Sequence, residues 1–435
     1  MTSRDTSQRF PETSDDVSRY CAAVIGAAEQ PFALGPGLPP LARALALLGA
    51  SFDAAEVEAV TAAAGVSIDP GVGLAQLAAA GVIVADAAGW RFRSEAAQAA
   101  IADTVAPPAR PPIHAAALAH ARHRLDGPEA WAKVAFHAVG AGDPAAAVAA
   151  AERLAAAAQA RHAALEAERW LTLALDQLGE RDLAARQRLL GERGAVRRSL
   201  THYEAAQSDL RAARELAAAR GDRVAVIELQ VEDGAVCDFT ERLGESARLI
   251  EDAAAQAVEL PPRVQARLDN WLGVVRARQE RLPEAQALLT AAIARADALD
   301  DHATATGSRL MLGGVLRRQG LVAEGRAVLD RAIDDCARAG DHFHLAIGLF
   351  NRVNAWRQLD RPREAEADAE RAIGVANRMG LDQVELGVGI AWPRGDHRAA
   401  DRAGAGIEAP GAGGQVETGG GAVSHRFSAA RCWPG

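Results

Sequence analysis

The stretch GVVRARQERLPEAQALLTAA, residues 273–292, contains the four positions that decide the fold: Gly273, Ala285, Leu289 and Ala292. The same four small or apolar positions recur in six stretches, at intervals of 39 or 40 residues. The first position is Ala155, Gly194, Gly234, Gly273, Gly313 and Val353. The second is Ala167, Ala206, Ser246, Ala285, Gly325 and Ala365; the third is Leu171, Leu210, Ile250, Leu289, Leu329 and Ala369; the fourth is Ala174, Ala213, Ala253, Ala292, Ala332 and Ala372. A fixed period of about 20 to 50 residues is typical of a solenoid.

Each stretch has the pattern of a helical hairpin. The last three positions are spaced i, i+4 and i+7, which places them on one face of a single helix. The first position falls on the preceding helix, where Gly or Ala lets the two backbones approach closely. Helix-breaking pairs such as Gly221-Asp222, Pro261-Pro262 and Gly340-Asp341 separate the stretches. We therefore predict an all-α solenoid of six repeats over residues 144–386, in which each hairpin buries its stripe against its neighbours.

Other segments differ in composition from the repeats. Residues 1–37 form a polar, Gly/Pro-broken lead-in with one short helix near 15–28. In residues 38–105, three helical stripes precede the apolar runs 82–84 and 90–92, which a turn separates, so we expect three helices followed by a β-hairpin. A proline-rich joint and connecting helices follow at 106–143. Residues 387–435 are rich in glycine, and we expect a disordered tail there.

The bulk composition excludes several classes of partner. The net charge is −9 and the isoelectric point about 5.7, so the chain has no general attraction for nucleic acid or anionic membranes. The four cysteines, which form no CxxC pair, are Cys21, Cys237, Cys336 and Cys432. They fit neither a disulfide framework nor a zinc site. The early apolar run at 21–28 is too short to span a bilayer and lacks a basic leader, so we expect a cytoplasmic protein.

The repeated positions resemble the tetratricopeptide repeat, with its pattern of Gly or Ala, Ala, a large apolar residue and Ala. The stretch beginning at Leu272-Gly273 is the most similar, and the resemblance covers about 240 residues. The last stretch departs most, with Val353 and Ala369 at two of its four positions. The units are longer than the usual tetratricopeptide length of about 34 residues. Repeats of this greater length resemble those of large bacterial ATP-dependent signalling regulators.

The preceding segment extends that resemblance. The sequence 48–53, the pair Ala80-Gly81 and the strand 90–92 resemble the winged helix that follows the nucleotide-binding core in STAND and AAA-type regulators, among them LuxR-type activators and kinase- or cyclase-linked ATPases. Arg110 and His114 resemble the start of the next helix in that group. Ser94 stands where the group often has His, and the nucleotide-binding core is not in this sequence.

We find no signature of catalysis or of a cofactor. A phosphate-binding loop needs a glycine-rich turn before its Lys, and the single lysine of the chain, Lys133, has none. There is no Gly-x-Ser-x-Gly nucleophile signature. Two His at i, i+3 could bind a metal, but no Cys or HExxH pattern accompanies the histidines near the joint, His114, His120, His123 and His137. We predict that the protein is not an enzyme and holds neither a metal nor a cofactor.

A winged helix often contacts DNA, but this one is poorly suited to it. The segment equivalent to a recognition helix, residues 70–80, has no Lys or Arg. Residues 38–105 contain three basic residues, Arg43, Arg91 and Arg93, and seven acidic ones. Affinity for duplex DNA depends largely on neutralising phosphates, so we expect a structural spacer and no nucleic-acid partner.

The concave face of the solenoid is the remaining candidate site. The repeat register places a row of polar residues there: Arg198, Arg278, Arg317, Arg318, Asn354 and Arg357. Arginines suit carboxylates or phosphates, so the row predicts a protein or peptide partner, and one of acidic character. The competing interpretation is that an Arg-rich chain simply places arginine on every surface. The Lys-containing carboxylate clamp of chaperone-binding repeats is absent.

The sequence therefore predicts a scaffold or sensor of a bacterial signalling system. One alternative is a transcriptional regulator that binds DNA directly or through a partner. The other is an inactive fragment of a larger ATPase or kinase regulator. An incomplete last repeat would leave an apolar end uncovered, which favours self-association.

Overall fold

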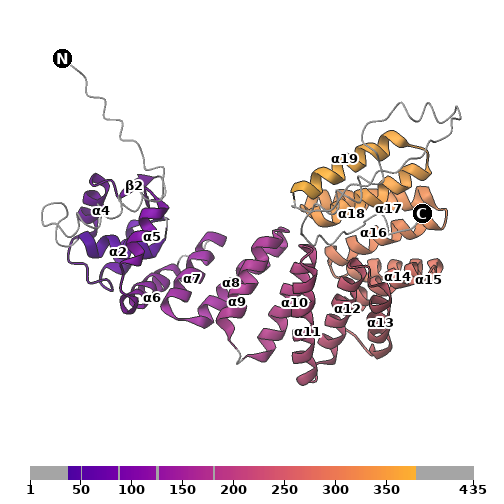
Figure 1. The fold of residues 1–435 in the computed structure, drawn as a ribbon, viewed down its shortest axis with the longest axis horizontal. Coiled ribbons are helices and arrows are strands. Elements are labelled where there is room, and N and C mark those ends of the chain that lie inside the picture. The colour runs from indigo at the N-terminus through magenta and orange to yellow at the C-terminus, as the bar shows by residue number, and fades with distance from the viewer. Residues whose placement is uncertain (1–37, 50, 87–88, 124–126, 180–181, 379–435) are drawn as a thin grey trace, which may run out of the picture. The chain divides into compact units, whose positions relative to one another are not determined.

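The computed structural model describes residues 38–49, 51–86, 89–123, 127–179 and 182–378. The helix expected at 15–28 and the glycine-rich segment 387–435 lie outside these residues. The chain forms two compact units, which we call unit 1 (residues 1–157 and 166–182) and unit 2 (residues 158–165 and 183–435). Figure 1 shows the elements of both.

Unit 1 contains helices and one small sheet. Its elements are α2 (Leu38–Leu48), β1 (Ser51–Phe52), α3 (Ala54–Thr61), α4 (Pro70–Ala79), β2 (Ile83–Asp86), β3 (Gly89–Phe92), α5 (Glu95–Asp103), the 3₁₀ turn η1 (Pro107–Ala109), α6 (Arg110–Ala121), α7 (Pro128–Ala141), most of α8 (Pro144–Ala160) and most of α9 (Ala164–Leu178). Three helices and the β2–β3 hairpin follow one another in the predicted order. Strand β1, which the sequence analysis did not predict, pairs antiparallel with β3 and gives the sheet order β1-β3-β2.

Local capping explains where the helices of this unit begin. The carboxylate of Asp53 accepts a hydrogen bond from the backbone N–H of Glu56, whose own carboxylate accepts one from the backbone of Asp53. This reciprocal pair satisfies backbone donors at the start of α3. Asp69 caps α4 and Ser94 caps α5 in the simpler one-way manner. Ser94 thus has a structural role as the cap of α5.

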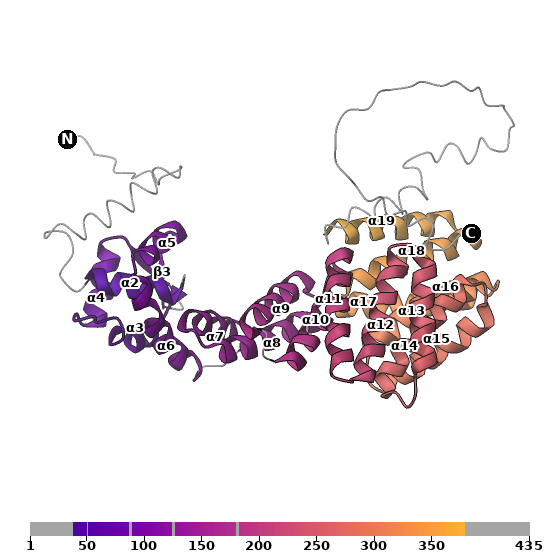
Figure 2. The same ribbon diagram turned by 60° about the horizontal axis from the view of Figure 1, so that its bottom comes forward.

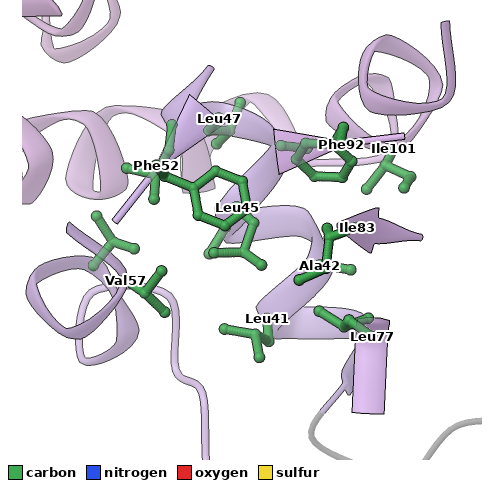
Figure 3. Close-up of a cluster of buried hydrophobic side chains, with 14 of the residues drawn as sticks. Leu41, Ala42, Leu45, Leu47, Phe52, Val57, Leu77, Ile83, Phe92 and Ile101 are labelled. Carbon is green, nitrogen blue, oxygen red and sulfur yellow. The ribbon is translucent and has the colours of Figure 1, made fainter. Parts of the chain in front are cut away.

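Large side chains fill the core of unit 1. Helix α2 is buried along most of its length, and its leucines share one core cluster with residues of all three strands and of the neighbouring helices. Figure 3 shows Leu45 in the middle of this cluster, with Phe52 and Val57 to one side of it. The rings of Phe52 and Phe92 meet edge to face, with centroids 5.8 Å apart.

Unit 2 is a stack of helical hairpins. Its helices are α10 (Leu183–Ser199), α11 (Tyr203–Ala219), α12 (Arg223–Phe239), α13 (Leu243–Gln256), α14 (Pro262–Arg278), α15 (Leu282–Asp297), α16 (His302–Arg318), α17 (Val322–Ala339), α18 (His342–Gln358) and α19 (Pro362–Arg378). With α8 and α9 they make the six predicted hairpins, and no strand follows residue 144 in the described part of the chain. The prediction of an all-α solenoid is confirmed.

The repeated positions form the contacts between the two helices of each hairpin. All the second, third and fourth positions outside Gly325 are buried side chains. A Cβ atom added at Gly313 would lie 2.5 Å from Cγ of Leu329, closer than real atoms approach. Gly194, Gly234 and Gly273 face Leu210, Ile250 and Leu289 in the same way. The glycine in the first helix therefore makes room for the large residue in the second.

The last repeat reaches the same packing with the sizes exchanged. Val353 occupies the glycine position and Ala369 the leucine position, and both are buried. The pair is the reverse of Gly313 and Leu329, so the volume lost on one helix is restored on the other. The departure noted in the sequence is therefore a compensated one.

The turn inside each hairpin has a repeated backbone conformation. One residue in each turn has φ between +55° and +85°, a left-handed conformation that favours glycine. These residues, again 39 or 40 apart, are Thr201, Glu241, Glu280, Gly320 and Asp360 in unit 2, preceded by His162. Because only one is glycine, the sequence analysis did not find this feature.

The even-numbered helices of unit 2 form its inner face. Each of α10, α12, α14 and α16 contacts the next even-numbered helix. Among the described residues, no two odd-numbered helices share an extensive contact. Helices on the inside of a curved stack lie closer together than those outside. Figures 1 and 2 show the odd-numbered helices of this unit following a curve from α11 to α19.

Candidate functional site

An aromatic cluster occupies one end of the inner face. Phe239, at the end of α12, stacks against Tyr203 with ring centroids 6.3 Å apart and meets Trp271 of α14 at 6.0 Å. It also meets Phe343, at the start of α18, at 5.9 Å. None of these four side chains is fully buried. We call Tyr203, Phe239, Trp271 and Phe343 the aromatic cluster.

The curvature of unit 2 creates this cluster. Two repeats lie between Phe239 and Phe343 along the chain, yet their rings are in contact. Beside them, Nδ1 of His344 lies 2.7 Å from Oδ2 of Asp341, and Nδ1 of His162 lies 3.9 Å from the same oxygen. Side chains from the first and last parts of unit 2 therefore meet here.

The sequence analysis missed the aromatic cluster, although the repeat register contains a signal for it. Phe239 follows Gly234 by the same five places that separate Arg278 from Gly273. Trp271 lies two places before Gly273. In a chain with only 4% aromatic residues, two aromatics at inner-face positions were a usable indication. Contact with Phe343 could not be foreseen, because it depends on the curvature.

Three of the six predicted site residues bind neighbouring repeats of the same chain. Nε and Nη2 of Arg278 donate to the two carboxylate oxygens of Asp238, at 3.3 and 3.1 Å. Arg318 donates to the backbone carbonyl of Ala277, at 2.9 Å, and to the carboxylate of Glu280. Both arginines thus join one inner helix to the preceding one.

Arg198 is the third of these. Its Nε lies 3.3 Å from Oε2 of Glu232, and both side chains are mostly buried. The orientation makes this an ion contact without a hydrogen bond, since neither atom has a hydrogen-bond partner. The guanidinium also lies 5.8 Å from the ring centroid of Phe239.

Arg317 differs from all three. The residue is only 7% exposed, yet no described side chain forms a hydrogen bond or an ion pair with it. Burial, and then the charge of the adjacent Arg318, lower the pKa of Arg317. An arginine still carries its charge at neutral pH, so this nearly enclosed cation has no counter-ion among the described residues.

The other two predicted residues are nearer to solvent. Arg357 is exposed at the end of α18, and among the described residues nothing pairs with it. The amide of Asn354 donates to the carbonyl of Phe350, one turn earlier in the same helix, at 3.4 Å. The predicted row is therefore not one uniform surface, because half of its members hold repeats together.

The described chain contains buried thiols and a buried histidine pair. Burial raises the pKa of Cys237 to about 11 and that of Cys336 to about 12, so both stay protonated at neutral pH and are poor nucleophiles. In unit 1, Nδ1 of His114 lies 3.1 Å from Nδ1 of His137. No described group of three or more His, Cys, Asp or Glu side chains is arranged to hold a metal ion. No described helix has the length and apolar composition that a membrane span requires.

Among solved structures, one similar chain covers both units. It is a signal transduction ATPase with numerous domains (STAND) with a tetratricopeptide repeat sensor, from Pyrococcus horikoshii. The two share 12% identity with a TM-score of 0.51, over 92% of this chain and 59% of that protein. This chain thus spans less than two thirds of the length of that protein. At this identity the likeness concerns the fold alone.

Two further structures are similar to a smaller degree. A Rap protein complexed with competence and sporulation factor matches 65% of this chain and 85% of its own at 10% identity, with a TM-score of 0.44. YrrB, a tetratricopeptide protein with an unusual peptide-binding site, matches 46% of this chain and 91% of its own at 18% identity, with a TM-score of 0.27. No protein-family profile and no curated protein sequence matches the chain. The fold is a tetratricopeptide-type α-solenoid.

Proposed function

We propose that this protein is a binding scaffold whose inner face on unit 2 holds an extended peptide or protein segment. The observation that carries this proposal is the aromatic cluster. Phe239, Trp271 and Phe343 on the inner helices, and Tyr203 at the start of α11, each keep part of their surface open to solvent. Aromatic side chains supply much of the energy of protein interfaces, and an aromatic-poor chain places four of them at one point.

The rest of the inner face supports the same role. Half-buried apolar side chains such as Met311, Ile347 and Phe350 lie on α16 and α18. Beyond its hydrogen bond to Phe350, the Asn354 amide has a further donor and an acceptor that a peptide backbone can use. A long curved surface of this kind suits a partner that binds in extended form. We place this activity in the cytoplasm of a bacterium, within a signalling pathway.

A selection from random peptides tests this function. The full chain is used to select from a displayed library of randomised 12-residue peptides, and affinities of the selected peptides are measured by fluorescence anisotropy. We expect Trp271→Ala to weaken binding by roughly tenfold or more, because loss of a central aromatic contact typically costs about 2 kcal/mol. Leu243→Ala, at the start of the outer helix α13 and 41% exposed, is the matched control and should leave affinity unchanged. Failure to select any peptide, or binding indifferent to Trp271, would refute the proposal.

A second candidate is that the chain serves as the sensor portion of a STAND-type ATPase regulator. The observation in its favour is the fold match over 92% of this chain, which includes unit 1. In this case α2–α4 and the sheet of unit 1 are a winged helix that acts as a spacer. The neighbouring reading frame decides between the two: a P-loop ATPase that co-purifies with this protein supports the second candidate, and the lack of any such protein refutes it.

A further inference from the structure

Arg198 and Arg317 occupy the same register position in two different repeats. Each follows the first repeated position by four residues, on α10 and α16 respectively. Arg198 contacts Glu232, which lies two residues before Gly234 on the next inner helix. The residue at the corresponding place for Arg317 is Asn351, two residues before Val353. The acidic residue that faces the first arginine is thus replaced by a neutral amide for the second.

Nothing else in the described chain neutralises Arg317. The adjacent Arg318 has the same charge and is held by the carboxylate of Glu280. The side-chain amide of Asn351 is directed to the carbonyl of Leu310, at 3.4 Å. Burying a charge without a partner is costly, because the loss of hydration is not offset by an ion pair.

The guanidinium of Arg317 nevertheless reaches the surface. None of its nitrogens is among the fully enclosed polar atoms that lack a hydrogen-bond partner. The small exposed part of the residue therefore includes the group that can donate to a ligand. Arg317 lies on the inner helix α16, which contacts the inner helix α18, and we therefore assign it to the proposed binding face.

We propose that Arg317 is the receptor for an acidic side chain, Asp or Glu, of an extended peptide lying against α16 and α18. This inference rests on the proposed peptide-binding function and specifies the partner chemistry. A carboxylate matches the planar guanidinium, and it supplies the counter-ion that Glu232 provides to Arg198. Only 7% of Arg317 is exposed, which favours a side chain as its ligand, because a peptide terminus would bring its backbone against the helices. The exposed Arg357, on the same face, adds positive charge along the path of the peptide.

Selections with matched variants test the inference. Peptides selected with the wild type should be enriched in Asp or Glu at one position, and Arg317→Gln should weaken their binding by about ten- to hundredfold, the worth of a hydrogen bond to a charged group. Asn351→Asp should weaken binding similarly, because the new carboxylate forms an ion pair with Arg317 and competes with the carboxylate of the peptide. Arg331→Gln, at an exposed arginine on the outer helix α17, is the control and should keep the affinity. Selection with Arg317→Gln should still yield peptides that depend on Trp271, but without the acidic preference.

Two synthetic peptides identify the source of the carboxylate. Replacing the enriched Glu or Asp by its amide should remove the dependence on Arg317, and amidating the C-terminus should not. If amidation alone removes the dependence, the acidic side-chain assignment is wrong. If wild-type peptides show no acidic preference, or Arg317→Gln keeps it, the inference falls while the proposed function stands. If no peptide is selected at all, both fall.

A measurement without ligand checks the internal geometry. The thermal midpoint of Asn351→Asp should stay at or above the wild-type value, since Arg317 pairs with the new carboxylate. In an Arg317→Gln background the same change should lower the midpoint, because the carboxylate is then buried alone. Equal effects in both backgrounds would show that the two residues do not interact and would overturn the assignment.

Discussion

The hydrophobic cores of the two units are packed with different kinds of side chain. In unit 1, aromatic and branched side chains surround a buried leucine-rich helix. Its sheet and its helix caps do not recur at a regular interval. Unit 2 repeats one contact in which a glycine on the inner helix accepts a leucine or isoleucine from the outer helix. The difference teaches that unit 1 is sensitive chiefly to lost volume, whereas the repeated contacts of unit 2 are sensitive to added volume as well.

The largest effect is expected from removing volume in unit 1. Phe52→Ala should lower the free energy of unfolding of unit 1 by about 3–5 kcal/mol, because a buried ring in contact with Phe92 leaves a cavity. Hydrogen exchange followed by mass spectrometry gives the loss of protection unit by unit. Val72→Ala, at a half-exposed site on α4, is the control and should change little. Unaltered exchange in unit 1 would show that Phe52 is not essential to its core.

The next effect tests sensitivity to added volume in unit 2. Gly313→Val should cost about 1–3 kcal/mol, because its side chain overlaps Leu329. Leu329→Ala should cost about 2–5 kcal/mol through the cavity that it leaves. The double variant reproduces the Val353 and Ala369 pair of the last repeat and should recover much of the lost stability.

Denaturant unfolding of the single and double variants measures this coupling. If the stability losses of the two single variants simply add in the double variant, the large and small side chains do not compensate each other. Exchanged side-chain sizes would then not explain the packing of the last repeat. The contrast with unit 1 would then lose its basis.

The smallest effect comes from acid and distinguishes the units by pH. Burial, then the charges of His114 and Lys133, lower the pKa of His137 from 6.5 to about 3. Between these values the unfolded chain binds a proton that folded unit 1 does not bind, so the stability of unit 1 falls as the pH falls below 6.5. The loss should reach about 2 kcal/mol at pH 5. In unit 2 the lowered pKa of Asp341 has its effect only below about pH 4.

Hydrogen exchange at pH 7 and pH 5, corrected for the intrinsic exchange rate, measures this loss in unit 1. His137→Asn keeps a polar side chain without the titration and should reduce the acid sensitivity. A variant as sensitive as the wild type would assign the effect to another group.

The two units also differ in how far their structure could be predicted. The repeats were predictable because the small residues recur at a constant interval, and each is required by the same close contact. Strand β1 was not, because a two-residue strand such as Ser51–Phe52 has no periodicity and forms only by pairing with β3. The left-handed turns were hidden because residues such as Glu241 and Asp360 adopt a conformation that glycine would have indicated.

The candidate site was predictable only in part. The register assigned Arg198, Arg278 and Arg317 to the first helices of their repeats, α10, α14 and α16, but it could not show which of them already had a partner. That depends on the residue that the next helix presents, Glu232 in one case and Asn351 in another, and on the orientation of the long side chains. The aromatic cluster needed the curvature of the whole unit.

By itself the order of amino acids determined that this chain would be a stack of paired helices, since a helix face and a close helix contact are local requirements that short spacings can encode. Only the tertiary structure decided which charges are neutralised and which aromatic rings meet. Those contacts join residues from separate repeats, and the small rotation between hairpins accumulates along the stack before they form.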